Sequence, residues 1–220
     1  LTRERDRFGA PVRRLLALNP GLQIVAHQVE LCAANVQQIF AGYDLIVDGS
    51  DRIGTRYLVN DACVIYGKTL VAAAIHRFEG QAMTYVPGKG PCYRCLYPEP
   101  SSEIPNCPTA GVLGVLPGVM GTLQATEAIK LIIGIGTPLV GRLFTYDALD
   151  LAFREFTFKR RSDCAVCGDA PTITRPSDID RPAGEVRTVS PPELKTLLRA
   201  TGRPITLIDV RDPDEFAAGH

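Results

Sequence analysis

The chain has 220 residues, and its apolar fraction of 45% and charged fraction of 22% are typical of a globular protein. Lysine plus arginine and aspartate plus glutamate each number 24, so the formal net charge is zero, and we expect neither nucleic acid nor a membrane as a partner. The most apolar stretch, 110–123, is too short to span a bilayer and indicates a buried helix. The charged start, LTRERDR, does not resemble a signal peptide, so a cytoplasmic protein is expected.

The first half of the chain alternates predicted helices and strands. In chain order these are a helix at 5–18, a strand at 23–31, a short helix at 35–40, a strand at 43–47, a helix at 53–66 and a strand at 70–75. The strands YDLIV and LVAAAI are uninterrupted apolar runs, which suit a sheet covered on both faces. Ser50 or Asp51 is the predicted N-cap of the helix between them. This alternation predicts an α/β fold built from parallel βαβ units.

The second half of the chain carries one long predicted helix among further strands. The elements are an antiparallel strand at 81–86, a helix at 117–133, a strand at 142–146 and an edge strand at 151–158. Small residues share one face of the long helix at spacings of three and four: Gly114, Gly118, Gly121, Ala125 and Ala128. We interpret this stripe as tight packing in the core, with a subunit interface as the second interpretation.

A composition change marks a second domain near the end of the chain. Residues 169–189 contain Pro171, Pro176 and Pro182 and few large apolar residues, which predicts a linker. Ser190-Pro191-Pro192-Glu193 then forms a capping box, and 205–210 (ITLIDV) reads as a buried strand. The predicted division is therefore 1–168, a linker at 169–189, and a new domain at 190–220.

Two CxxC pairs are the most specific motif of the sequence. Cys92 and Cys95 form one pair, and Cys164 and Cys167 form the other, far along the chain. Each pair places two thiolates on one side of a tight turn, and two pairs complete a tetrahedral S₄ site that suits Zn²⁺. Because four thiolates leave no open coordination position, we predict a structural zinc site that joins two distant segments. Redox-active pairs and chance spacing are the alternatives.

Asp48 and Asp51 follow the predicted strand at 43–47. In open α/β sheets the ligand crevice lies beyond the carboxyl ends of the strands. Two carboxylates at that place are able to hold Mg²⁺ on a nucleotide phosphate. The simpler interpretation, an aspartate that only caps the following helix, agrees equally well with the sequence.

Cys107 lies outside both CxxC pairs, in the segment PNCPTAGVLG. An exposed thiol in such a proline-rich loop is a candidate nucleophile, and an incidental loop cysteine is the alternative. Cys32 and Cys63 have apolar neighbours and are predicted to lie in the core.

Six sequence blocks together resemble one family. In chain order they are VDGSDRIGTRYLVNDACVIYGK, AIHRFEGQ, PCYRCLYPEP, NCPTAGVLGVLPGVMGTLQATEAIKLIIG, TYDAL and CAVCG. They resemble the adenylyltransferases that activate ubiquitin-like sulfur-carrier proteins in molybdopterin, thiamine and related pathways. The segment at 190–220 resembles the first part of a rhodanese domain. The resemblance implies a Rossmann-like ATP-binding adenylation domain with a structural zinc, followed by the start of an α/β rhodanese domain that serves as a sulfurtransferase.

The resemblance also implies a reaction and a set of residues. The C-terminal Gly-Gly carboxylate of a small β-grasp carrier protein attacks the α-phosphate of Mg·ATP, which forms an acyl adenylate and pyrophosphate, and sulfur then displaces AMP. Asp51 matches the family's essential acidic residue, a nucleotide and magnesium contact, and the four paired cysteines match its zinc ligands. Cys107 matches a cysteine that in some members bonds to the carrier or its sulfur. A homodimer is likewise an expectation from the family.

The sequence departs from the family pattern at two charged positions and at both ends. Arg52 stands where the family has asparagine, and Arg7 stands where it usually has lysine, so a positive charge that can contact phosphate is present at both. The family's glycine-rich turn would precede Leu1, and the persulfide cysteine of a rhodanese would follow His220. We therefore expect the chain to be a fragment, inactive by itself, of a longer enzyme.

Two other functions stay open on the sequence. One is a non-catalytic scaffold, held together by zinc, that docks a β-grasp partner without activating it. The other is a nicotinamide-binding oxidoreductase of similar fold, whose GxGxxG fingerprint these residues do not contain.

Overall fold

The computed structural model describes residues 6–100 and 111–179. The chain divides into two compact units, Leu1–Asp180 and Arg181–His220, and all of the described residues belong to the first unit. Within it, Ile173 packs on the core and Asp178 accepts a hydrogen bond from the backbone N–H of Ala33 at 2.9 Å. The predicted division into 1–168, 169–189 and 190–220 stays a prediction.

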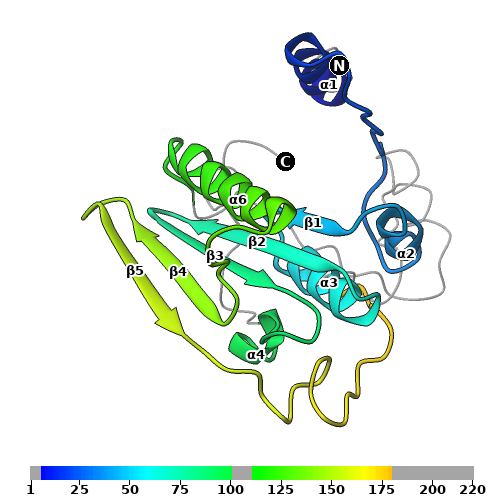
Figure 1. The fold of residues 1–220 in the computed structure, drawn as a ribbon, viewed down its shortest axis with the longest axis vertical. Helices are drawn as coiled ribbons and strands as arrows, with labels where there is room; N and C mark the ends of the chain where they lie inside the picture. Colours follow the sequence, from blue (N-terminus) through cyan, green and yellow to red (C-terminus); the bar gives the residue numbers. More distant parts are fainter. Residues whose placement is uncertain (1–5, 101–110, 180–220) are drawn as a thin grey trace, which may run out of the picture. The chain divides into compact units, whose positions relative to one another are not determined.

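Helices flank a five-stranded sheet in the first unit (Figure 1). The described elements are α1 (Asp6–Leu18), α2 (Val36–Phe40), β1 (Leu45–Asp48), α3 (Ile53–Ile65), β2 (Thr69–His76), β3 (Glu79–Tyr85), α4 (Tyr93–Leu96), α6 (Leu116–Ile133), β4 (Arg142–Asp147) and β5 (Ala152–Thr157). The strand order is β1-β2-β3-β4-β5, so β5 lies at an edge, as its imperfect alternation predicts.

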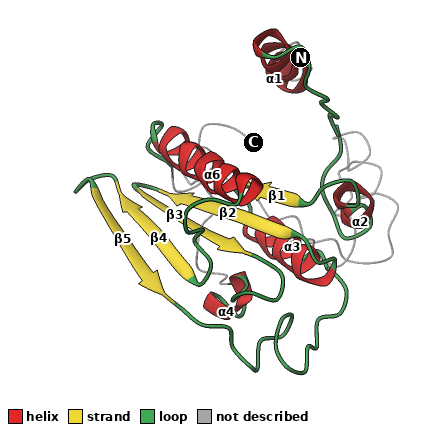
Figure 2. Cartoon of the chain, viewed as in Figure 1, coloured by secondary structure: helices red, strands yellow, loops and turns green. Residues whose placement is uncertain are grey.

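The sheet is mixed rather than wholly parallel. Strands β1 and β2 run parallel, with Asp48 opposite Ala72, and α3 is the crossover between them, as predicted. The other neighbouring pairs, β2–β3, β3–β4 and β4–β5, are antiparallel, which confirms the antiparallel strand predicted at 81–86. Strands β2 and β3 are joined by only Arg77 and Phe78, and such a short connection forces these two strands to pair antiparallel (Figure 2).

Two apolar clusters lie on opposite faces of β2, because its side chains alternate between the faces. Leu70 and Ala72 belong to the cluster that includes α3, α4 and the paired cysteines. Ala73 and Ile75 belong to the cluster under α6. The sheet is therefore covered on both faces, as the apolar runs predict.

The strand predicted at 23–31 is not formed. This segment has no regular structure, and Val25 and Val29 are 65% and 59% exposed. A strand needs a neighbour that accepts and donates its ladder hydrogen bonds. Among the described residues β1 is the end strand and pairs with β2 alone, so 23–31 does not pair with the open edge of β1 and forms no ladder.

The N-cap of α3 also differs from the prediction, which named Ser50 or Asp51. The N-cap is Arg52, in an extended conformation and without a side-chain capping hydrogen bond. The preceding residues are already engaged in a tight turn, in which the Ser50 N–H donates to the Asp48 carboxylate at 2.9 Å. At the other end, Gly67 has a φ of 65° just after the C-cap, the left-handed position at which glycine commonly ends a helix.

Helix α6 presents a different face to the sheet than its glycine pattern predicts. Its buried residues are Leu116, Met120, Gln124 and Glu127. Gly118, Gly121 and Ala125 are exposed, and a Cβ at Gly114, Gly118 or Gly121 would meet nothing within 4 Å. The prediction that the small-residue stripe packs in the core is therefore wrong. The opposite face of the helix is buried instead, and its polar side chains, Gln124 and Glu127, make hydrogen bonds there.

Within 6–100 and 111–179, none of the helices combines the length and the apolarity that crossing a membrane requires. Helix α6, with 18 residues, also carries Glu127 and Lys130.

Candidate functional site

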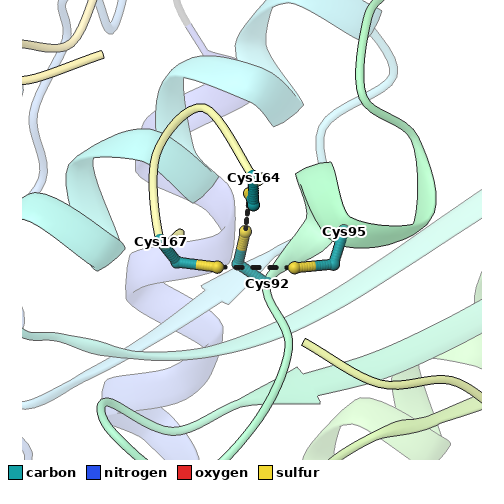
Figure 3. Close-up of side chains that lie close together, drawn as sticks. All are labelled: Cys92, Cys95, Cys164 and Cys167. Carbon is teal, nitrogen blue, oxygen red and sulfur yellow. Dashed lines mark hydrogen bonds between the residues drawn. The ribbon is translucent and has the colours of Figure 1, made fainter. Parts of the chain in front are cut away.

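The four paired cysteines come together at one point (Figure 3). Their sulfur atoms all lie within 4.8 Å of one another. The Sγ atoms of Cys92 and Cys164 are 3.7 Å apart, and those of Cys95 and Cys167 are 3.4 Å apart. A disulfide needs about 2.05 Å, whereas four sulfurs around a zinc ion at about 2.3 Å stand about 3.8 Å apart. The cluster therefore fits one tetrahedral metal ion.

Tight turns shape each CxxC segment. Cys92 is the N-cap of the short helix α4, and the Cys95 N–H donates to the Cys92 carbonyl at 3.0 Å. At the second pair, the Gly168 N–H donates to the Cys164 carbonyl at 2.9 Å. A Cβ at Gly168 would lie 2.4 Å from that carbonyl oxygen, so no larger residue fits this turn. The backbone N–H of Arg161 also donates to the Cys95 sulfur at 3.5 Å.

Burial and mutual repulsion make it unfavourable for all four cysteines to be ionised unless a cation is bound. Burial raises the pKa of Cys92, and the charges of the other three cysteines raise it further. Burial, together with a hydrogen bond to Cys95, raises the pKa of Cys167 to about 12. Burial opposes ionisation of Cys164 as well, but backbone hydrogen bonds at Val166 and Cys167 outweigh it and lower that pKa. Four thiolates coexist at neutral pH only when a metal ion balances their charge.

A buried ion pair joins the first CxxC segment to α3. Arg94, between Cys92 and Cys95, donates through Nε and Nη2 to both carboxylate oxygens of Asp61, each at 2.8 Å. The two side chains are 6% and 0% exposed, and the guanidinium carbon lies 4.6 Å above the Tyr57 ring centroid. The sequence prediction did not include this pair. Two features of the sequence could have indicated this ion pair: an arginine between the cysteines of a CxxC pair, and an aspartate inside a mostly apolar predicted helix.

A second group of polar residues lies where β1 ends. The Asp48 carboxylate is 6% exposed and accepts the Ser50 N–H. The Arg56 guanidinium, from α3, donates to the Ser50 carbonyl through Nε at 3.3 Å and Nη2 at 3.2 Å. Burial raises the pKa of Asp48, partly opposed by Ser50 and Arg56. Asp51 follows directly and is exposed.

Two pockets flank this turn, one on each face of the sheet. The pocket on the α3 face is lined at its polar end by Asp48, Arg56, Gln81, Tyr93 and Tyr97. The pocket on the α6 face is lined by Gly49, Ser50, Ala73, Ala74, Ile75, Pro117, Met120, Gly121 and Gln124. Ala73 and Ala74 border both. The turn therefore stands in a concave region at the carboxyl end of a parallel strand, the place where ligands bind in α/β sheets.

The remaining residues named from the sequence lie in different surroundings, and one of them lies outside the described residues. Arg52 forms an ion pair with Glu30 at 2.9 Å, and both side chains are at least half exposed. Arg7 lies in α1. Cys107 lies outside the described residues. Cys63 is fully buried, as predicted, and Cys32 is half-buried.

Together, the fold and the cysteine cluster define an α/β protein with a parallel crossover, a strand-end crevice and four clustered cysteines that fit one metal ion. The chain matches the ThiF family over residues 5–166 and belongs to that family.

Three relatives show how much of a longer protein the chain spans. It is 50% identical over 167 residues to the sulfur carrier protein adenylyltransferase of Thermus thermophilus, covering 73% of the chain and 62% of that protein. It is 49% identical over 165 residues to the SAMP-activating enzyme E1 of Haloferax volcanii, covering 74% and 60%. It is 41% identical over 213 residues to the adenylyltransferase and sulfurtransferase MOCS3 of Sus scrofa, covering 90% and 47%. The chain thus spans about half to three-fifths of these relatives.

Solved structures support the fold. The crystal structure of E. coli MccB with MccA-N7isoASN matches with a TM-score of 0.61 at 20% identity, covering 74% of this chain and 51% of that one. The expected α/β, Rossmann-like fold is confirmed by this match and by the family assignment.

Proposed function

We propose that the whole protein uses Mg·ATP to adenylate the C-terminal glycine, part of a Gly-Gly end, of a ubiquitin-like sulfur-carrier protein. The observation that carries this proposal is the near-50% identity to two enzymes whose names state carrier activation. The adenylate prepares the carrier for thiocarboxylate formation, because AMP is a good leaving group for incoming sulfur. The carrier belongs to molybdopterin, thiamine or related sulfur chemistry.

We further propose that a rhodanese-like domain beginning at residue 190 transfers the sulfur. The alignment with the adenylyltransferase and sulfurtransferase of Sus scrofa covers 90% of the chain and so extends beyond residue 168. The whole protein is then expected to release sulfite from thiosulfate in the presence of a thiol acceptor. Absence of this activity in the whole protein would remove the second half of the proposal without affecting the first.

Asp51 is the proposed magnesium and nucleotide contact. Asp51 is exposed and directly follows the turn at the end of β1, and Mg²⁺ on a phosphate prefers carboxylate oxygen ligands. Arg52 is the proposed phosphate contact beside it; its exposed pair with Glu30 is weak enough to exchange for a phosphate. Arg7 is proposed as a further phosphate contact, on the charge of its side chain and the family pattern alone. Magnesium binds with the nucleotide, as part of the substrate.

Pyrophosphate exchange in the whole protein, with its carrier, tests the adenylation step. We expect Asp51→Asn to lower the exchange rate by a factor on the order of 100 or more, because the developing charge on the phosphates loses its metal contact. Asp150→Asn, at an exposed turn, is the matched control and keeps the wild-type rate. An unaltered rate in Asp51→Asn would remove the catalytic assignment. No exchange by the wild-type protein would favour the scaffold alternative.

Cys107 is proposed as the thiol that bonds covalently to the carrier or to its sulfur. Its support is the match of NCPTAG to the family motif and its place in the sequence outside both CxxC pairs. Mass spectrometry of the protein after incubation with carrier and ATP is expected to show a thioester, formed when the Cys107 thiolate displaces AMP from the carrier adenylate, and hydroxylamine is expected to cleave it. Cys107→Ser is expected to abolish the adduct, and an adduct that persists in this variant would contradict the assignment.

We propose Zn²⁺ as the resident metal, held by Cys92, Cys95, Cys164 and Cys167 in a structural role. The four-sulfur set and its tetrahedral spacing support zinc. Elemental analysis of the whole protein is expected to find one zinc ion at this cluster, and Cys92→Ser with Cys95→Ser is expected to remove it. Cys32→Ser is the control that keeps the metal. Full zinc retention in the double variant would exclude the four-cysteine site.

A homodimer and a reducing cytosolic location complete the proposal. The outward face of α6 supports the dimer, because Val115, Ile129 and Ile132 are 64%, 54% and 74% exposed there. The six cysteines within the described residues form no disulfide, which supports a reducing compartment.

A further inference from the structure

Three side chains from three elements hold the backbone of the turn that precedes Asp51. Gln124, on α6, donates through Nε2 to the Asp48 carbonyl at 2.6 Å. The Asp48 carboxylate accepts the Ser50 N–H at 2.9 Å. Arg56, on α3, donates twice to the Ser50 carbonyl. The turn is therefore held from both faces of the sheet, by α6 on one side and α3 on the other.

Packing alone does not account for Gln124. Its side chain is 7% exposed and lies on the face of α6 that also carries Leu116 and Met120. A buried amide is costly unless its hydrogen bonds are made, and an apolar residue would fill the same space at no such cost. Its Nε2 meets the carbonyl of Asp48 at the end of β1 and that of Val71 in β2. Gln124 thus joins α6 to the point where the candidate nucleotide site begins.

Asp48 serves the turn rather than a metal ion. One of its carboxylate oxygens is already bonded to Ser50, and the side chain is almost fully buried. Asp51, three residues further, is exposed, and it directly follows Ser50, which lines the pocket on the α6 face. The arrangement leaves one carboxylate of the predicted pair to face the nucleotide and uses the other to hold the loop.

We infer that Gln124, Asp48 and Arg56 are positioning residues, which fix the backbone of Asp48–Ser50 and so place the Asp51 carboxylate for the magnesium of Mg·ATP. This inference rests on the proposed adenylation. Groups that orient a metal contact affect metal affinity without touching the metal, and a preorganised loop lowers the cost of binding.

The test varies free Mg²⁺ at saturating ATP and measures pyrophosphate exchange by the whole protein with its carrier. Gln124→Met keeps the length of the side chain and removes both N–H bonds. It is expected to raise the half-saturating Mg²⁺ concentration by about 10- to 100-fold. Arg56→Lys keeps the charge but loses the two-point contact with Ser50, and a shift in the same direction is expected. It is also the second variant should Gln124→Met fold poorly.

Glu127→Gln is the matched control, because Glu127 is on the same helix and equally buried. Its carboxylate accepts from Thr84 and from the Leu139 N–H, away from the turn, and it pairs with Lys130. This variant is expected to lower stability and leave the Mg²⁺ dependence at the wild-type value. An equal Mg²⁺ shift in Glu127→Gln would show general loosening of α6 and overturn the inference.

Binding of Mn²⁺·ATP, followed by electron paramagnetic resonance, gives a readout that does not need turnover. Gln124→Met is expected to weaken this binding by the same factor as it shifts the Mg²⁺ dependence. Wild-type binding without exchange would end the proposed adenylation, yet the comparison of variants would still decide the positioning role. Equal Mn²⁺·ATP affinities of the wild-type protein and both turn variants would overturn the inference.

Discussion

At the scale of single residues, the Arg94–Asp61 pair is the contact with the largest expected cost of removal. The ion pair is buried and bidentate, and Arg94 also donates to the Pro98 carbonyl at 3.0 Å. Nearby, the Tyr57 hydroxyl donates to the carbonyls of Tyr97 and Glu99. These bonds join the first cysteine pair, the chain that follows it, and α3.

Arg94→Met is expected to lower the free energy of unfolding by about 3–5 kcal/mol, because Asp61 then stays buried without a partner. Urea unfolding measures the change. The control is Arg161→Met, whose ion pair with Asp163 is exposed, and its unfolding midpoint is expected to stay unchanged. Equal midpoints for Arg94→Met and the wild-type protein would show that the buried pair contributes nothing net.

Gly168→Ala is expected to abolish tight metal binding at the second cysteine pair. The added Cβ would lie 2.4 Å from the Cys164 carbonyl oxygen and 2.6 Å from that of Ser162, so the turn must open. Zinc content after exhaustive dialysis measures the effect. Gly42→Ala, where a Cβ meets nothing within 4 Å, is the control that keeps its zinc. A zinc-replete Gly168→Ala protein would contradict the steric account.

At the scale of elements, α6 has an unusual distribution of side chains. Its inward face carries Gln124 and Glu127, whose polar atoms are satisfied on the sheet, while its outward face carries large apolar residues. In a monomer these apolar side chains stay in contact with water and contribute no free energy of burial. A second copy of the chain is able to cover this face. The exposed positions Val115, Ile129 and Ile132 are uncharged, so a two-fold axis brings no like charges together there.

Ile132→Asp is expected to shift the whole protein from dimer to monomer, since a charge at this position would face its own copy. Light scattering coupled to size-exclusion chromatography measures the mass. Leu149→Asp is the control, because Leu149 is 69% exposed on the turn between β4 and β5 and is not part of α6. A dimer that survives Ile132→Asp at micromolar concentration would exclude this face as the interface.

At the scale of the whole unit, the cysteine cluster, the proposed zinc site, brings together two segments that are 72 residues apart, those of Cys92 and Cys164. The cysteines belong to the same apolar cluster as Phe40 and Leu58, so the centre also completes a core. Binding of the proposed zinc is therefore expected to contribute directly to folding, because the unfolded chain has no preformed site.

Removal of the metal by a chelator is expected to lower the melting temperature of the protein by more than about 10 °C, at several kcal/mol of lost binding energy and about 2–4 °C per kcal/mol. Differential scanning calorimetry measures the shift, and added zinc is expected to restore the original value. Equal melting temperatures with and without metal would show that the site is not structural.

The sequence by itself determined the features that depend on local spacing. Two CxxC pairs specified a four-sulfur site, glycine and proline marked the ends of α3 and α6, and the apolar runs identified β1 and β2. Tertiary structure alone decided which face of α6 turns inward, because Gln124 and Glu127 are tolerable there only beside the carbonyl of Asp48 and the N–H of Leu139. It also decided that 23–31 is not a strand, since strand formation depends on a neighbour and not on alternation.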